Sequence, residues 1–278
     1  MKAEEFVMDY ESVTAMPHAL GLAHVDNDRQ LGGYVNKEGR KIRMDRLLRT
    51  ANLHNLQDDD IALLTDKYHV KTIIDFRTRL EAAAKPDVSI PGTDYVWISV
   101  NPEVAEDKNP VMHANDDELS MVMEMVKMPF DLYGFYIEII KTFRAQQGYR
   151  KFFDYLLSNP DGCSVLWHCN AGKDRTGIAA VFLMSVLDFD RETMMEDYLL
   201  TNEYRADRIE SMLEKARELT DDERIVTGIR CMFGVMSETM EQMMDWCDRE
   251  YGSVKGFVQK KINLSDDEID RLKAMYLE

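Results

Sequence analysis

A cysteine and an arginine stand six positions apart in the stretch VLWHCNAGKDRTG, which runs from Val165 to Gly177. An apolar run ends at His168, a short polar loop begins at Cys169, and Arg175 opens a second apolar run. This order predicts a strand, a tight loop and the start of a buried helix. The backbone N–H groups of such a loop can converge on one anion, and the helix N-terminus adds partial positive charge. The stretch therefore predicts an anion-binding loop that begins with a thiol.

The residue types of this loop suit phosphate-ester chemistry. Positive potential of this kind lowers the pKa of a thiol from ~8.5 toward ~3.5–7.5, so Cys169 is expected to be a thiolate at neutral pH. Arg175 can contact two phosphate oxygens with its planar guanidinium. In-line attack of the thiolate on phosphorus would give a phosphocysteine, which water then hydrolyses. Thr176 is placed to donate a hydrogen bond to the sulfur and so to help it leave.

Three other interpretations of the stretch fit less well. A cysteine at a strand end is often a small buried apolar residue, but that role does not explain the arginine six positions on, or Gly172 and His168. A nucleotide-binding Walker loop needs Ser or Thr after Lys173, where Asp174 stands. Metal ligation by His168 and Cys169 lacks a second pair of ligands at suitable spacing, so we expect neither a metal nor a cofactor.

Expelling an alcohol or phenol from phosphorus requires a general acid. None of the three tryptophans is followed by Pro-Asp, so the sequence contains no Trp-Pro-Asp loop. Three aspartates are candidates. Asp75 ends a predicted parallel strand and is ranked first, followed by Asp174, which its cationic neighbours should hold ionised, and then by Asp131.

The other loop residues are expected to bind the substrate phosphate: His168, Asn170, Ala171, Gly172, Lys173 and Gly177. Lys173 could contact a second phosphate or pair with a nearby carboxylate, and pairing is favoured. The same choice applies to Arg77 and Arg79, where a structural ion pair is again favoured.

Composition sets wider limits. The chain has 278 residues, 45% of them hydrophobic and 31% charged, and its net charge is −17. So acidic a protein is expected to repel nucleic acid. No apolar run is long enough to span a bilayer, and the N-terminal residues do not resemble a secretory signal. The four cysteines form no CxxC pair, so we expect a reducing, cytoplasmic location.

The elements that position the loop follow from hydrophobic patterning. Residues 20–100 indicate short strands and turns, with strands at 70–76 and 94–100, and a further strand at 163–168. From about residue 118 helical periodicity prevails, with apolar faces at 132–143, 178–187 and 236–247 and a last helix from Ser265. We expect one α/β domain over 1–278, with a mostly parallel central sheet, a helix-rich C-terminal half, and a lid or mobile segment at 101–130.

The chain resembles a known family along nearly its whole length. HCNAGKDRTG, from His168 to Gly177, is similar to the HCxxGKDRTG signature of the atypical bacterial tyrosine phosphatases. Residues 27–34, NDRQLGGY, resemble the family's NxRDLGGY block, except that Gln30 stands where aspartate is usual. Further similar blocks are LLRTANL at 47–53, IDFRTRLE at 74–81, DYLLTN at 197–202 and YGSV at 251–254.

The resemblance implies a cysteine-phosphatase fold and an enzyme that acts on phosphotyrosine proteins, with phosphoserine and phosphothreonine as further substrates and phosphate as product. It leaves two alternatives open: a phosphoinositide or inositol-phosphate phosphatase using the same loop, and a non-catalytic phosphopeptide-binding module. The intact cysteine, arginine and threonine disfavour the second. The resemblance also leaves signal-independent export conceivable.

Overall fold

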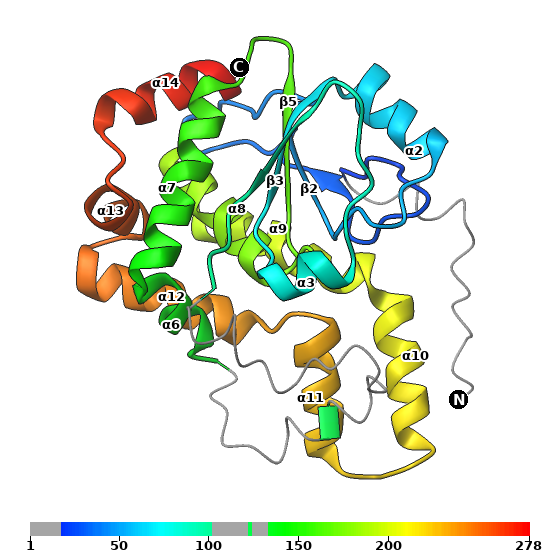
Figure 1. Cartoon of the computed structure of the whole chain (residues 1–278). Helices are drawn as coiled ribbons and strands as arrows, with labels where there is room; N and C mark the ends of the chain where they lie inside the picture. The colour runs from blue at the N-terminus through cyan, green and yellow to red at the C-terminus, as the bar shows by residue number, and fades with distance from the viewer. Residues whose placement is uncertain (1–17, 102–121, 124–132) are drawn as a thin grey trace.

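The computed structural model describes residues 18–101, 122–123 and 133–278, and a five-stranded sheet lies at their centre (Figure 1). The strands are β1 (Arg29–Gln30), β2 (Leu47–Thr50), β3 (Val70–Asp75), β4 (Asp94–Trp97) and β5 (Ser164–His168). Their spatial order is β1-β2-β5-β3-β4. All neighbouring pairs are parallel except β1 with β2, which confirms the mostly parallel sheet.

Both faces of the sheet are buried, and successive strand residues pack on opposite faces. Leu47 and Val165 belong to the larger apolar core, whereas Leu48 and Leu166 belong to a second core on the other face. This alternation follows from the two-residue period of a strand. Strands covered on both faces are typical of parallel sheets in α/β proteins.

Helices account for most of the remaining chain. They are α2 (Asp58–Ala62), α3 (Arg79–Ala84), α6 (Phe135–Lys141), α7 (Phe143–Ser158), α8 (Asp174–Val186), α9 (Arg191–Tyr204), α10 (Ala206–Arg217), α11 (Glu223–Phe233), α12 (Ser237–Tyr251), α13 (Val254–Phe257) and α14 (Asp266–Tyr276), with π-helical turns η1 (Leu63–Lys67) and η2 (Val258–Ile262). The long helices α7 and α8 belong to the larger core, whereas α2 lies on the other side of the sheet and packs on the second core (Figure 1). The helix-rich C-terminal half is confirmed.

Several sequence-based expectations hold at the level of single elements. The helix predicted from Ser265 is α14, and it begins with a capping box in which Ser265 and Glu268 satisfy each other's backbone N–H groups. The apolar face predicted at 236–247 lies in the core, with Met240, Met243 and Met244 buried on α12.

Two expectations need correction. The apolar face at 132–143 belongs to two helices: α6 ends at Lys141, and Thr142, in an extended conformation, caps α7 by accepting a hydrogen bond from the Ala145 amide. Because an N-cap residue has non-helical backbone angles, Thr142 cannot continue the preceding helix. Residues 20–100 also contain helices α2 and α3, which were too short to show a clear helical period.

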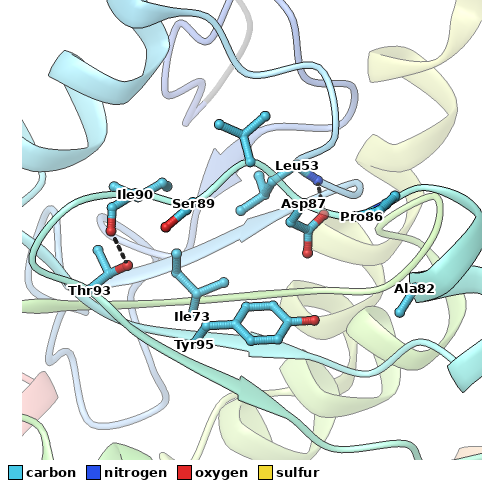
Figure 2. A pocket seen from close by; sticks show the side chains of 10 residues that line it. Leu53, Ile73, Ala82, Pro86, Asp87, Ser89, Ile90, Thr93 and Tyr95 are labelled. Carbon is cyan, nitrogen blue, oxygen red and sulfur yellow. Dashed lines mark hydrogen bonds between the residues drawn. The ribbon is translucent and has the colours of Figure 1, made fainter.

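A cavity of about 330 Å³ lies beside β3, between the residue 86–93 loop and helix α3 (Figure 2). Its walls are mainly apolar, and Tyr95 and Asp87 supply polar groups at one end. Asp87 also accepts a hydrogen bond from the backbone amide of Leu53, 2.8 Å away. Neither Cys169 nor Arg175 lines this cavity, so it is separate from the thiol-containing loop.

The lid expected at 101–130 lies outside the described residues except for residues 101, 122 and 123. Its role, and the extent of a single domain over 1–278, stay predictions.

Candidate active site

The loop that starts at Cys169 follows β5, the middle strand of the sheet, and leads into α8. It therefore stands at the carboxyl edge of the sheet, where ligand sites of α/β proteins form. Gly172 has a positive φ of 66°, and a Cβ there would lie 2.7 Å from the amide nitrogen of Ala51 and closer still to the Thr50 carbonyl. Only glycine lets the loop pack this closely against the end of β2.

Cys169 is almost fully buried at the start of the loop. Burial alone would raise the pKa of its thiol, but the charge of Arg175 and interactions with Thr176 outweigh burial, so the pKa lies below its usual value. The buried Thr176 hydroxyl has no oxygen or nitrogen partner among the described residues, which leaves it available to the sulfur. These surroundings favour a thiolate.

Arg175 is fixed by a partner that the sequence did not single out for catalysis. Its Nη1 and Nη2 donate to the two carboxylate oxygens of Glu81 at 2.6 and 2.8 Å. Glu81 lies in the first turn of α3 and also completes a capping box with Thr78. Burial would raise the pKa of Glu81, but Arg175 outweighs it and lowers that pKa to about 2. This bidentate pairing of guanidinium and carboxylate sets the plane of the guanidinium.

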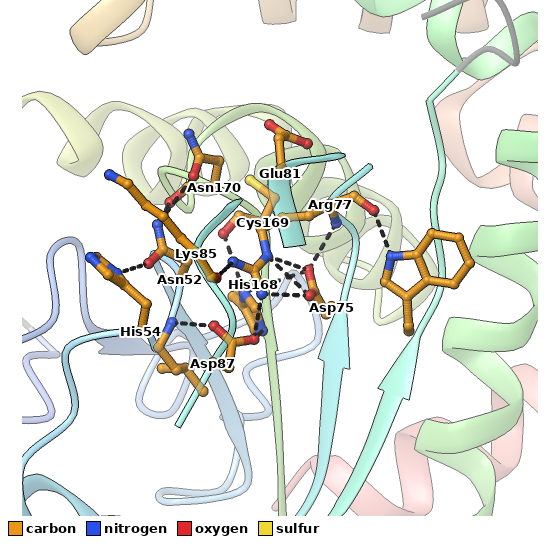
Figure 3. Close-up of polar contacts among 12 residues, drawn as sticks. Asn52, His54, Asp75, Arg77, Glu81, Lys85, Asp87, His168, Cys169 and Asn170 are labelled. Atoms are coloured by element: carbon orange, nitrogen blue, oxygen red, sulfur yellow. Dashed lines mark hydrogen bonds and ion pairs between the residues drawn. The ribbon is translucent and has the colours of Figure 1, made fainter. Parts of the chain in front are cut away.

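Asp75, ranked first as the general acid, is fully buried and surrounded by donors (Figure 3). Arg77 donates from Nη2 to Asp75 Oδ2 at 2.8 Å, and the hydroxyl of Tyr95 donates to the same oxygen at 2.6 Å. Burial would raise the pKa of Asp75, but His168 and Arg77 outweigh it, so the pKa is lowered. A buried, ionised, fully engaged carboxylate is a poor proton donor. For Arg77 the structural ion-pair interpretation is confirmed.

His168 is also fully buried, between two carboxylates. Its Nε2 lies 3.2 Å from Asp87 Oδ2, and its Nδ1 lies 3.8 Å from Asp75 Oδ1 and 3.2 Å from the Cys169 carbonyl oxygen. Burial would lower the pKa of the imidazole, but Asp75 and Asp87 outweigh it and raise that pKa. His168 was expected to bind substrate. Its place behind the loop instead favours a role in holding the cysteine backbone.

Asp174, unlike Asp75, lies in partly exposed surroundings that suit a proton donor. It lies in the first turn of α8, and its side chain is 23% exposed. The hydroxyl of Tyr136 donates to Asp174 Oδ1 at 2.6 Å, and Lys173 Nζ lies 3.0 Å from Oδ2. Lys173 also donates to the carbonyl of Cys231 at 2.9 Å, so its pairing interpretation is confirmed. Asp131 lies outside the described residues.

Side chains from distant segments bind the backbone carbonyls of the loop. Asn52 donates to the Asn170 carbonyl at 2.8 Å, and Arg205 donates to the Ala171 carbonyl at 3.1 Å. The Gly172 carbonyl accepts from Asn27 at 3.0 Å and from Arg49 at 2.9 Å. Asn27, Arg49 and Asn52 lie in the family-like blocks of the sequence, but no local pattern predicted a role for them.

Two further positions have local, structural roles. Gly177 is buried in the first part of α8, where a Cβ would lie 3.2 Å from the ring of Tyr198, so glycine allows the helix to pack closely here. Its expected contact with the substrate stays a prediction. Gln30, the departure from the family-like block, exchanges hydrogen bonds with Asp45 through its side-chain amide. Gln30 therefore stabilises the turn before β2.

Two groups of side chains have metal-ligand composition among the described residues. The first, Asp75, Asp87 and His168, already encloses the guanidinium of Arg77. In the second, Asp60 pairs with His24 and accepts a hydrogen bond from the Ala23 amide, which ties this surface loop to α2. Both groups are accounted for by their own hydrogen bonds.

Comparison with known proteins places this geometry in a family. The sequence pattern of the tyrosine phosphatase family matches residues 20–278. The chain belongs to the tyrosine phosphatase family. It is a tyrosine phosphatase and hence a hydrolase.

Individual relatives are distant but cover most of the chain. A Cupriavidus necator protein, provisionally named a tyrosine-protein phosphatase, is 25% identical over 94% of this chain and 89% of its own length. A tyrosine-protein phosphatase of Nostoc commune is 27% identical over 84% of this chain and 74% of its own. The triple specificity protein phosphatase PtpB of Mycobacterium tuberculosis is 24% identical over 85% of this chain and 92% of its own.

Among the helices formed by the described residues, none combines the length and apolar character that crossing a bilayer requires.

Proposed function

We propose that this tyrosine phosphatase works through a phosphocysteine intermediate formed on Cys169. The Sγ thiolate attacks phosphorus, the bond from phosphorus to the ester oxygen breaks, and that oxygen takes a proton from the general acid. Water then attacks the phosphocysteine, the resulting carboxylate accepts a proton from it, and the S–P bond breaks. Inorganic phosphate leaves, and the thiolate is restored.

The observation that carries this proposal is the environment of the thiol. Cys169 lies at the N-terminal end of a buried helix, its pKa is lowered chiefly by Arg175, and Arg175 is itself locked by Glu81. In the resting enzyme the guanidinium is therefore already oriented, and the surroundings of the thiol favour its ionised form. Such preorganised charge is the main source of transition-state stabilisation in reactions of this kind.

We assign the proton donor to Asp174 rather than Asp75. Asp174 is partly exposed beside the phosphate loop, whereas Asp75 is sealed beneath it by Arg77 and Tyr95. The hydrogen bond from Tyr136 orients the Asp174 carboxyl group. A candidate acid must first reach the leaving oxygen, and its protonation state matters only after that.

The proposed substrates are proteins that carry phosphotyrosine, with phosphoserine and phosphothreonine proteins as a second group. The name of PtpB, a triple specificity protein phosphatase, supports more than one class of substrate. The phosphoinositide alternative gains no support from Lys173, because Asp174 and the Cys231 carbonyl already engage this cation. Cys163, Cys169, Cys231 and Cys247 are all free thiols, and a nucleophilic thiol is best preserved in a reducing cytoplasm.

Trapping the intermediate tests the mechanism. After a rapid quench during turnover of a phosphotyrosine peptide, mass spectrometry should find phosphate on Cys169. Cys169→Ser should abolish turnover yet still bind the peptide. A serine variant with near wild-type turnover would exclude the proposed nucleophile. Loss of wild-type activity in EDTA would show that a metal takes part, which this mechanism does not require.

A further inference from the structure

A cluster of buried charges lies behind the phosphate loop and has no place in the steps above. It consists of Arg29, Arg49 and Asp197, each at most 1% exposed. Arg29 Nε donates to Asp197 Oδ1 at 2.9 Å, and Arg49 Nη1 donates to Asp197 Oδ2. The three residues come from β1, β2 and α9, so the cluster joins segments that are far apart in the sequence.

The charges of the cluster do not cancel. Two guanidiniums share one carboxylate, which leaves one net positive charge in the interior. Burial and the nearby Arg29 lower the pKa of Arg49, but only to about 10, so Arg49 is protonated at neutral pH. Asp28 adjoins Arg29, but its carboxylate binds the Leu22 amide, and burial raises its pKa to about 7, so it neutralises the cluster only in part.

An uncompensated buried cation is costly unless it interacts with an anion. The available anion is the thiolate, because the charge of Cys169 is among the groups that favour the protonated form of Arg49. Arg205 is a further buried cation behind the loop. It is 8% exposed, and its Nε has no hydrogen-bond partner among the described residues.

The cluster also holds the backbone of the phosphate loop. Arg49 Nη2 donates to the Gly172 carbonyl. Arg29 donates to the side-chain oxygen of Asn27, whose amide group donates to the carbonyls of Ala171 and Gly172. In a planar trans peptide the C=O and N–H groups point in opposite directions. Carbonyls drawn toward the cluster therefore turn the N–H groups of Gly172 and Lys173 away from it, toward the opposite side of the loop.

We propose that Arg29, Arg49 and Asp197 form a positioning cluster for catalysis, which orients the amides of the phosphate loop and supplies buried positive charge to the Cys169 thiolate and the bound phosphoryl group. The role rests on the proposed function of Cys169. The orienting role depends on hydrogen bonds, whereas the electrostatic role depends on charge. Suitable substitutions can therefore separate the two roles.

Four variants separate the orienting role from the charge role. Arg49→Met removes the charge and the hydrogen bonds. Arg49→Lys keeps the charge but loses the planar guanidinium that donates to two acceptors at once. Asn27→Gly removes the link to the carbonyls without altering charge, and it suits the positive φ of 58° at this position. Arg150→Met is the matched control, because Arg150 pairs with Asp154 and Glu268 away from the loop.

Two measurements report on the charge role and on the orienting role. The pKa of the Cys169 thiol comes from the pH dependence of its alkylation by iodoacetamide, with the modified residue identified by mass spectrometry. Loop geometry is reported by competitive inhibition by inorganic phosphate, with thermal unfolding confirming that each variant is folded. Neither readout requires Cys169 to be the nucleophile, so failure of the proposed function would appear separately, as turnover by Cys169→Ser.

Arg49→Met should raise the thiol pKa by about one unit and weaken phosphate binding at least tenfold. Arg49→Lys and Asn27→Gly should leave the thiol pKa near wild type and weaken phosphate binding alone, while Arg150→Met changes neither. Equal thiol pKa values for Arg49→Met and Arg49→Lys would overturn the charge role. Unchanged phosphate binding in Asn27→Gly would overturn the orienting role.

Asp197→Asn should shift the thiol pKa in the direction opposite to Arg49→Met. Removing the carboxylate leaves more positive charge behind the loop, so the thiol pKa should fall, whereas simple loosening of the loop would raise it. If Asp197→Asn or Arg49→Met does not fold, the comparison of Arg29→Met with Arg29→Lys decides the charge role by the same criterion.

Discussion

At the residue scale, Asp174 and Asp75 show how surroundings divide roles between identical side chains. Asp174 is partly exposed and held by one neutral hydroxyl and one lysine, whereas Asp75 is enclosed by Arg77, Tyr95 and His168. The partly exposed position of Asp174 suits the proton-donor role proposed above. Asp75 is buried and forms an ion pair with Arg77 beneath the loop.

Leaving-group dependence should separate the two aspartates. Asp174→Asn is expected to slow hydrolysis of phosphotyrosine by two or more powers of ten, and hydrolysis of an activated aryl phosphate much less, because only a poor leaving group needs the proton. Asp75→Asn should weaken folding and affect both substrates alike. The measurement is kcat over a series of aryl phosphates. A leaving-group slope that steepens in Asp75→Asn instead would reverse the assignment.

The Glu81 carboxylate couples stability to pH. Its pKa is lowered to about 2, so its contribution is fully present above the usual glutamate pKa and is lost as pH falls from about 4.5 toward 2. The shift from 4.5 to about 2 corresponds to at most about 3–4 kcal/mol. Glu81→Gln should therefore lower the free energy of unfolding at pH 7 and flatten its dependence on pH below about 4.5. Urea unfolding at several pH values measures both effects.

Glu268 offers a matched control for Glu81. Its pKa is also lowered to about 2, mainly by a hydrogen bond from Arg150, but the pair lies at the surface. Solvent screening makes such pairs worth about 0–1 kcal/mol, so Glu268→Gln should change stability little and leave kcat intact. Glu81→Gln should in addition lower kcat, because Arg175 loses the partner that sets its plane. Equal effects of the two variants would contradict this distinction.

At the scale of elements, the phosphate loop depends on its contact with the end of β2. Gly172→Ala would place a methyl group against the backbone of Thr50 and Ala51 at a φ of 66°. The loop must then move away from β2 and from the side chains that bind its carbonyls. We expect kcat to fall at least a hundredfold, with an added conformational cost of about 1–2 kcal/mol.

Gly252 is the control for Gly172→Ala. It also has a positive φ, 84°, but a Cβ there would meet nothing within 4 Å. Gly252→Ala should thus incur the conformational cost without loss of kcat. Activity and thermal unfolding of the two variants give the comparison, and a wild-type kcat for Gly172→Ala would show that the loop tolerates displacement.

At the scale of the whole molecule, a net charge of −17 opposes a site built to bind anions. Local cations dominate near the loop because charges beyond a Debye length are screened, ~8 Å at physiological salt but ~30 Å at 0.01 M. Long acidic substrates should therefore feel the global repulsion most at low salt.

Salt should consequently change substrate preference. As ionic strength rises from about 0.01 M to about 0.15 M, kcat/KM for a phosphotyrosine peptide with acidic flanks should rise relative to that for a peptide with basic flanks. Steady-state rates at several salt concentrations provide the ratio, and a small aryl phosphate serves as reference. A ratio independent of salt would mean that the global field does not reach the substrate.

The sequence by itself determined the elements whose signals are local. The apolar runs at 70–76 and 163–168 identified β3 and β5, and the capping box at Ser265 identified the start of α14. The Cys169–Arg175 spacing identified the loop, because only the five residues 169–173 separate β5 from α8, which restricts what those side chains can contact. Periodicity and turn chemistry act over a few residues, so they can be read without the fold.

Tertiary structure alone decided the partners and the exposure of the charged groups. Arg175 meets Glu81 across 94 positions, and Arg29 meets Asp197 across 168. No local pattern indicates which of many carboxylates will fill such a role, or that Asp75 will be sealed while Asp174 stays partly exposed. Burial and ion pairing depend on how sheet and helices pack, and they set the charge and pKa of each group. The sequence therefore specified the residues of the loop, and the packing of distant segments specified their electrostatics.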